Sequence, residues 1–459
     1  MRKYFGTDGI RRIANTELTP ELVYKVAKAG AYVLSKHTDH APTIFIGRDT
    51  RISGTLIESA MTAGFLSYGA NVKMLGVMPT PAVAYLTKKF KADASVVISA
   101  SHNTFEFNGV KYFSNKGMKI PDELEEEIEE VMDSGKINEL TAVNDKIGTS
   151  EIATELLDEY VYFFRKNFEE DLERLNRDDF VVAVDTANGA TSVVADKVFT
   201  VLGIKHHILN DSPNGININD GCGSTHLEML KQYVIDKKCS LGIAYDGDGD
   251  RCLAVDENGN EIDGDKIIAI ISQYLKSKGK LNKDTIVATV MSNLGLNKYA
   301  KQNELNFVQT KVGDRYVLEE MLKNGYNLGG EQSGHVICLD YNPTGDGILT
   351  SLMMIRAILE QGKKASEVAS IMKAYPQVLI NAKVSSDKKY DFDKDEEIKS
   401  AIEKLNKEFD GNGRVLIRAS GTEPLVRVMI EGEDQDYIKQ KAQTIASLIE
   451  QKLGDEVKK

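Results

Sequence analysis

The sequence predicts an α/β protein with three related α/β units followed by a smaller α+β domain. Three times a β-branched run ends in a polar loop with a helical segment nearby, in the ranges 43–101, 180–250 and 285–335. After Pro376 the pattern changes to alternating strands and two amphipathic helices. At 459 residues the chain is too long for one ordinary core, so we expect three or four domains.

Composition excludes several classes of protein. A net charge of −12 argues against a general binder of nucleic acid or anionic membranes. The first residues lack an apolar signal region and no apolar run reaches membrane-spanning length, so we expect a cytoplasmic protein. The four cysteines show no CxxC spacing, so the sequence suggests neither a disulfide framework nor a zinc site. We expect buried free thiols at Cys222, Cys239, Cys252 and Cys338.

The first unit begins with a helix at Thr19-Pro20, a capping hydroxyl followed by proline in the first turn. A strand is expected at 43–48, and a helix from Gly54 to about Tyr68, where Gly69 is placed to end it. The second unit has strands at 180–185 and 240–245, and the third has a strand at 285–290. Each presents a polar loop after a strand, which predicts that three loops converge on one cleft.

Candidate boundaries lie in the acidic stretch 122–150, in the turn 256–260 and around Tyr375-Pro376. The predicted last domain has a strand at 378–384, a helix at 394–409, a strand pair within 413–430 and a final helix at 436–453. The predicted domains are 1–150, 151–255, 256–370 and 371–459. They carry, in that order, a serine loop, an acidic loop, a sugar-binding loop and a phosphate-binding loop.

The serine loop follows a short buried strand and contains Ser99, Ser101 and His102. A serine hydroxyl is a poor nucleophile alone, so a role in phosphoryl transfer requires a metal, a base and fixed positive charge. A turn with satisfied hydrogen bonds is the alternative.

The acidic loop has aspartates at positions 246, 248 and 250 with glycines between them, followed by Arg251. Three like charges this close repel unless a cation lies among them, and hard oxygen ligands suit Mg²⁺. The acidic loop does not match an EF-hand calcium site, because Arg251 occupies the position where an EF-hand loop needs glycine. The segments on either side of the loop are also predicted strands, whereas an EF-hand has helices there. The alternative to a metal site is that this loop is a solvated acidic turn. Arg251 adds a fixed positive charge that is suited to binding a phosphate.

Three further loops carry candidate ligand contacts. Glu331 and Ser333 can hydrogen-bond the hydroxyls of a sugar, although an ordinary polar loop explains them equally well. The range 418–427 combines glycine, hydroxyls and two arginines, which suits an anion better than a plain hairpin turn. Near the start, glycines that permit tight turns lie beside Thr7, Arg11 and Arg12; the two arginines could bind a phosphate, although a solvated arginine pair is the alternative.

Taken together, the segments 99–103, 246–251, 330–335 and 418–424 resemble the α-D-phosphohexomutase superfamily, and the likeness runs from Phe5 into the last domain. The ranges 5–11, 222–226 and 290–295 look most like its bacterial members that act on glucosamine phosphates. The resemblance implies three α/β domains with mixed sheets and a fourth, TATA-binding-protein-like domain around a central cleft.

The resemblance also implies a mechanism. As a phosphoserine, Ser101 gives its phosphoryl group to glucosamine 6-phosphate or glucosamine 1-phosphate. The resulting 1,6-bisphosphate reverses its orientation in the cleft and returns its other phosphoryl group to Ser101. One Mg²⁺ would be held by Ser101, Asp246, Asp248 and Asp250. The implied catalytic residues are Ser101, His102, Lys111, Arg251 and His335. The implied or expected substrate contacts are Thr7, Arg11, Lys311, Glu331, Ser333, Arg418, Ser420, Gly421, Thr422 and Arg427.

Three positions depart from the family pattern. Thr104 replaces a usual proline, Phe107 replaces a frequent carboxylate, and Arg12 replaces a glycine. Loss of proline should loosen the serine loop more than it changes the chemistry. A phosphoglucomutase or phosphomannomutase with the same mechanism, a weakly catalytic sugar-phosphate binder and a Mg²⁺-dependent phosphatase are the alternatives, and a homodimer is left open.

Overall fold

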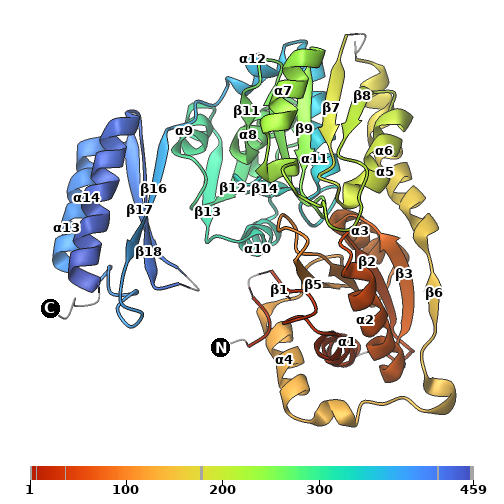
Figure 1. Ribbon diagram of the computed structural model, residues 1–459. Helices are drawn as coiled ribbons and strands as arrows, with labels where there is room; N and C mark the ends of the chain where they lie inside the picture. Colours follow the sequence, from red (N-terminus) through yellow and green to blue (C-terminus); the bar gives the residue numbers. More distant parts are fainter. Residues whose placement is uncertain (1–2, 7, 37, 176–178, 421–422, 455–459) are drawn as a thin grey trace. The chain divides into compact units, whose positions relative to one another are not determined.

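The computed structural model describes residues 3–6, 8–36, 38–175, 179–420 and 423–454. It divides into two compact units (Figure 1). The larger unit comprises Met1–Met291 and Glu304–Ile371, and the smaller unit comprises Ser292–Asn303 and Met372–Lys459.

The first sheet of the larger unit has six strands in the order β1-β5-β4-β2-β3-β6. Helices α1 and α2 pack against each other, and α4 packs on α1. Thr19 caps α1 through a hydrogen bond from the Leu22 amide, and left-handed Gly69 ends α2, as predicted. The strands are β1 (Ile10–Ile13), β2 (Thr43–Arg48), β3 (Asn71–Val77), β4 (Ala94–Ile98), β5 (Phe107–Ser114) and β6 (Ser150–Ile152); the helices are α1 (Pro20–Leu34), α2 (Gly54–Tyr68), α3 (Thr80–Phe90) and α4 (Asp122–Asp133).

The acidic stretch 122–150 contributes to this first sheet. It forms α4, whose Glu129 carboxylate accepts the backbone amides of Lys3, Tyr4 and Phe5 at 2.6–2.7 Å. The stretch then leads into β6, which pairs parallel with β3. Residues 3–5 are therefore fixed to the first sheet through α4.

The second sheet has the order β11-β10-β9-β7-β8 and the third has the order β13-β12-β14-β15. The second contains β7 (Val181–Asp185), β8 (Lys205–Leu209), β9 (Leu241–Tyr245), β10 (Cys252–Asp256) and β11 (Glu261–Ile262), with α5 (Leu157–Glu173), α6 (Ala195–Val201) and α7 (Glu228–Lys237). The third contains β12 (Thr285–Thr289), β13 (Asn306–Thr310), β14 (Leu328–Gly330) and β15 (Val336–Cys338), with α8 (Gly264–Ser277), α10 (Asp314–Asn324), α11 (Gly347–Gln361) and α12 (Ala365–Ala369). Short 3₁₀ turns lie at Lys136–Asn138, Asn144–Lys146, Thr154–Leu156, Ala190–Val193, Gly223–Thr225 and Asn282–Asp284.

The three sheets share one topology. Each contains three neighbouring parallel strands with an antiparallel partner at one side, in the orders β5-β4-β2-β3, β10-β9-β7-β8 and β15-β14-β12-β13, and the first sheet adds the parallel strand β6 beside β3. The loop between the last parallel strand and its antiparallel partner carries Ser101 in the first sheet, Asp246 to Asp250 in the second and Glu331 to His335 in the third. The repeat predicted from sequence pattern is thus a repeat of topology.

The smaller unit has an antiparallel sheet in the order β16-β18-β17. Its strands are β16 (Gln377–Lys383), β17 (Gly413–Ala419) and β18 (Leu425–Gly432), and two helices, α13 (Glu396–Phe409) and α14 (Gln435–Leu453), pack against them (Figure 1). Helix α9 (Leu294–Gln302) also belongs here, although it lies within the range 256–370 predicted for the third domain. The Asn293 carboxamide oxygen accepts the Tyr375 amide, and Glu431 accepts the Leu294 amide.

No helix among the described residues has the length and apolar character needed to cross a membrane. The four cysteines are buried and free, as predicted.

Replacing the residue that caps α14 should weaken the smaller unit. The Asp434 carboxylate accepts the amides of Asp436 and Tyr437 at 3.0 and 2.9 Å. We expect Asp434→Ala to lower the free energy of unfolding by about 1 kcal/mol, because those amides lose their acceptor. Urea unfolding followed by circular dichroism measures the change, with exposed Gln440→Ala in the same helix as control. Equal stability of the two variants would contradict the capping role.

Candidate active site

Ser101 lies at the tip of the loop between β4 and β5 and is 1% exposed. Its hydroxyl donates to Asp246 Oδ2 at 2.6 Å, and its amide donates to Ser99 Oγ at 2.9 Å. Its φ of 53° is left-handed, a conformation that a serine adopts only when its surroundings enforce it. The first and second sheets therefore meet at the predicted nucleophile.

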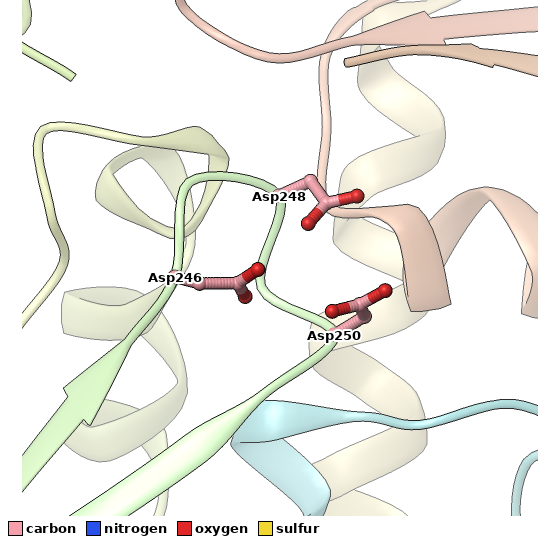
Figure 2. A group of neighbouring side chains, drawn as sticks. All are labelled: Asp246, Asp248 and Asp250. Carbon is pink, nitrogen blue, oxygen red and sulfur yellow. The ribbon is translucent and has the colours of Figure 1, made fainter. Parts of the chain in front are cut away.

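The aspartates of the acidic loop project from one turn into the same small volume (Figure 2). Asp246, Asp248 and Asp250 each offer a carboxylate oxygen within 4.8 Å of the others, and all three are buried. Within the part of the chain that the structure describes, Asp248 Oδ1 and Asp250 Oδ1 have no hydrogen-bond partner. Buried, unpaired carboxylate oxygens are costly, and hard oxygen donors of this kind fit Mg²⁺.

The charges of this cluster set its protonation. Burial, followed by the charges of Asp250 and Asp248, raises the pKa of Asp246 well above its ordinary value. Burial also opposes ionisation of Asp248, yet the Lys111 ammonium 2.9 Å away lowers the pKa of Asp248. A divalent cation would relieve the repulsion that raises the pKa of Asp246.

Lys111 on β5 is the cation nearest to these carboxylates. Its Nζ lies 2.9 Å from Asp248 Oδ2, 3.1 Å from Asp8 Oδ2 and 3.6 Å from Asp250 Oδ2. Burial alone would disfavour the ammonium, but these carboxylates raise the pKa of Lys111 well above its ordinary value. Lys111 is therefore a fixed positive charge within the carboxylate cluster, and phosphoryl transfer requires such a charge.

His102 also lies close to the Ser101 hydroxyl. Its Nδ1 lies 3.4 Å from Ser101 Oγ. Burial, together with the charges of Arg251 and Arg11, lowers the pKa of His102 to about 4. The imidazole is consequently neutral at pH 7 and can accept a hydrogen bond.

A cavity of about 660 Å³ adjoins the cluster in the larger unit. Five predicted residues line it: Arg11, Asp250, Arg251, Glu331 and His335. Burial raises the pKa of Glu331, whose carboxylate accepts the Gly313 amide at 3.2 Å. The cavity combines guanidinium, carboxylate and imidazole groups, which suits a charged polyol.

Three residues that the sequence analysis did not single out also line this cavity. Asp8 accepts hydrogen bonds from Arg11 and Lys119, and Lys119 also contacts Asp314 Oδ2 at 2.5 Å. His335 Nε2 lies 3.4 Å from the same Asp314 oxygen. These pairs connect the first sheet with the third. Asp8 stands in the glycine-rich opening segment, which was the only sequence signal for any of the three.

Two predicted contacts are not part of this cavity, and three others are not described. Lys311 and Ser333 are exposed, and neither belongs to the described residues that line the cavity. Thr7, Gly421 and Thr422 lie outside the described residues. The assignments of these five residues to the substrate site stay predictions.

In the smaller unit, two predicted arginines face each other across adjacent strands. Arg418 on β17 is directly opposite Arg427 on β18. Burial and the Arg427 charge lower the pKa of Arg418. Like charges directly opposite in a sheet are destabilising, and an anion would relieve this repulsion. Ser420, which is 3% exposed, directly follows β17, and its hydroxyl accepts the Glu423 amide at 3.3 Å.

The departures at positions 104 and 107 do not leave the serine loop unsupported. The carbonyls of Thr104 and Phe107 both accept hydrogen bonds from Arg51. Arg12 lines the cavity and donates to the Lys3 carbonyl at 2.9 Å. Arg51 follows β2 in a polar loop visible in the sequence, but no motif indicated its target.

Known protein families match four segments of the chain. The phosphoglucomutase/phosphomannomutase α/β/α domains I, II and III match residues 2–139, 158–259 and 263–375, and the C-terminal domain of the same family matches residues 379–448.

Curated relatives match along almost the whole chain. A phosphoglucosamine mutase of Ruminiclostridium cellulolyticum is 52% identical over 454 residues, covering 99% of this chain and 100% of that protein. One from Clostridium botulinum is 54% identical over 456 residues with the same coverage.

Solved structures share the fold at lower identity. A phosphoglucomutase/phosphomannomutase family protein of Burkholderia thailandensis has a TM-score of 0.79 at 20% identity, covering 97% of both chains. An N-acetylphosphoglucosamine mutase of Aspergillus fumigatus, in complex with GlcNAc-6P and magnesium, has a TM-score of 0.70 at 18% identity, covering 98% of this chain and 96% of that one.

Removing one charge of the acidic loop should weaken metal binding. In Asp248→Asn the loop loses a carboxylate, and we expect Mg²⁺ affinity to fall at least about tenfold, which corresponds to about 1.4 kcal/mol. Isothermal titration with Mg²⁺ measures the effect. Asp220→Asn, an exposed aspartate of the same sheet region, is the control. Equal affinity in both variants would show that the aspartates do not form the metal site.

Proposed function

The chain belongs to the phosphoglucomutase/phosphomannomutase family, and from this premise we propose that it interconverts glucosamine 6-phosphate and glucosamine 1-phosphate. The choice of sugar is supported by relatives over 50% identical along the full chain that carry the name phosphoglucosamine mutase. The chemistry is supported chiefly by the Ser101 hydroxyl, which lies 2.6 Å from a buried carboxylate of the aspartate cluster.

In the proposed reaction, Ser101 carries a phosphoryl group in the resting enzyme. The free hydroxyl of the hexosamine monophosphate attacks phosphorus, the bond from phosphorus to Ser101 Oγ breaks, and a 1,6-bisphosphate forms. The sugar then presents its other phosphate, which returns a phosphoryl group to Ser101 and leaves the isomeric monophosphate. The net reaction moves one phosphoryl group and consumes no second substrate.

The surroundings of Ser101 support this step. Lys111, whose ammonium lies 2.9 Å from Asp248, and Arg251, which lines the cavity, would neutralise charge on the phosphoryl group as it transfers. His102 is neutral and can accept a hydrogen bond from the attacking hydroxyl, whose proton must leave. Asp246 holds the serine oxygen in place in the dephosphorylated state.

The same cluster would hold Mg²⁺ through Asp246, Asp248, Asp250 and an oxygen of phosphorylated Ser101. When bound, the ion would supply positive charge to the phosphoryl oxygens. A hexosamine 1,6-bisphosphate would serve as the primer that first loads Ser101.

We assign the sugar to the cavity of the larger unit. Glu331 can accept two sugar hydroxyls, while Arg11 and His335 supply donors, and Lys311, Ser333 and Thr7 remain proposed contacts. Arg418, Ser420 and Arg427, with Gly421 and Thr422, are proposed to bind the phosphate that is not reacting. The opposed arginines support that role, because an anion relieves their mutual repulsion.

Loss of the Ser101 hydroxyl should abolish turnover. We expect Ser101→Ala to lower the rate of glucosamine 6-phosphate conversion, with Mg²⁺ and a trace of bisphosphate, by on the order of 10⁴-fold or more. Mass spectrometry should find phosphate on the Ser101 peptide of the unaltered chain. Exposed Ser134→Ala is the control. Full activity in Ser101→Ala would refute the mechanism, and faster turnover of glucose or mannose phosphates would move the substrate within the same family.

Loss of an arginine from the smaller unit should weaken substrate binding. Charge-assisted hydrogen bonds contribute about 1.5–3 kcal/mol, so we expect Arg427→Ala to raise KM by roughly 10- to 150-fold. Steady-state kinetics with glucosamine 6-phosphate gives KM and kcat separately. Lys439→Ala, an exposed cation on α14, is the control and should leave KM unchanged. An unchanged KM in Arg427→Ala would remove this residue from the proposed phosphate site.

A further inference from the structure

Arg51 is a buried arginine whose side chain donates almost entirely to the serine loop. It is 1% exposed and follows β2. One terminal nitrogen donates to the carbonyls of Ser101 and Asn103 at 2.9 and 2.8 Å. The other donates to the carbonyls of Phe107, at 3.1 Å, and Thr104.

The fifth donor of the guanidinium, Nε, bonds Asp49 Oδ2 at 2.8 Å. All five N–H groups of Arg51 are therefore used, and four of them donate to backbone carbonyls, three in the serine loop and one at Phe107, the first residue of β5. A planar guanidinium presents its donors in a rigid fork, so the four carbonyls are held in one relative geometry. Lysine has a single flexible nitrogen and cannot reproduce that pattern.

Asp49 extends the network to the reactive residue itself. The same Oδ2 accepts the Ser99 hydroxyl at 2.6 Å, and Ser99 Oγ accepts the Ser101 amide at 2.9 Å. Ser101 is thus tied at its amide through Ser99 and at its carbonyl by Arg51. These two ties lie on either side of the left-handed φ of 53° that points the hydroxyl toward Asp246.

A second donor comes from the part of the chain that carries the aspartates. Asn219 Nδ2 donates to the carbonyls of Ser101 and Asn103, both at 2.8 Å. Each of these two carbonyls therefore accepts from Arg51 and from Asn219. The asparagine fastens the loop to the second sheet region, and the arginine fastens it to the first.

We propose that Arg51 is a positioning residue for phosphoryl transfer, which fixes the serine loop so that Ser101 Oγ is held against the aspartate cluster. This inference rests on the proposed function. Arg51 does not line the cavity described above and is not assigned to contact the sugar or the metal. Its effect would be on orientation, and misplacement of a reacting group by about 1 Å can cost about 10²-fold in rate.

The test compares Arg51→Lys with the unaltered chain in the mutase assay. We expect kcat to fall about 10²-fold while KM stays within about twofold, because orientation is lost and the binding groups remain. Hydrogen exchange followed by mass spectrometry should show faster exchange confined to residues 99–108. In Arg51→Ala, added methylguanidinium should restore part of kcat.

Arg356→Lys is the matched control. Arg356 is 3% exposed, pairs with Asp171 at 2.8 Å and belongs to the larger unit, and its hydrogen bonds among the described residues go to Asp171, Tyr341 and Met353 and not to the serine loop. A purely structural role predicts that both variants lose stability and keep kcat. If Arg51→Lys keeps its kcat, or loses it only as Arg356→Lys does, the proposal is wrong.

A second variant and a second measurement test the proposal if Arg51→Lys does not fold or if no mutase activity is found. If Arg51→Lys does not fold, Asn219→Ala removes donors from two of the same carbonyls and should lower kcat with KM unchanged; unchanged kcat in that variant overturns the proposal. If the unaltered chain converts no hexose phosphate, the proposed function fails. Hydrogen exchange of residues 99–108 then still decides whether Arg51 fixes the loop, and protection unchanged in Arg51→Lys would show that it does not.

Discussion

The buried negative charge of one short loop is the constraint on which the rest of the larger unit depends. Asp246, Asp248 and Asp250 are buried, and each has a carboxylate oxygen within 4.8 Å of a carboxylate oxygen of the other two. The repulsion between these carboxylates is partly offset by the Lys111 ammonium and by the hydroxyl groups of Ser101 and Thr80, which donate to Asp246 and Asp248. Two carboxylate oxygens still lack a hydrogen-bond partner among the described residues, which fits a site for a divalent cation.

Repeated topology explains how a serine and an acidic loop meet although they are far apart in the chain. In each sheet the same loop joins the last parallel strand to its antiparallel partner. That position lies at the carboxyl end of a parallel strand, where ligands bind in α/β proteins. The third copy of this loop brings Glu331 and His335 to the cavity beside the first two.

Backbone fixation complements this electrostatic arrangement. A left-handed serine at the tip of a loop requires support from its surroundings. Arg51, Asp49 and Asn219 provide it through hydrogen bonds to backbone groups and to Ser99. The smaller unit contributes positive charge, because two arginines lie opposite each other on adjacent strands of its antiparallel sheet.

The sequence by itself determined the three α/β repeats, the final α+β domain and the loops that carry Ser101 and the aspartates. These features are local: strand and helix periodicity extends over a few residues, and three carboxylates with glycines between them are dense enough to indicate a cation. Tertiary structure decided the pairing of Lys119 with Asp8 and Asp314, the targets of Arg51, and the place of α9 in the smaller unit. Those outcomes depend on which distant backbone and side-chain atoms come within hydrogen-bonding distance, and that is fixed only when the sheets pack.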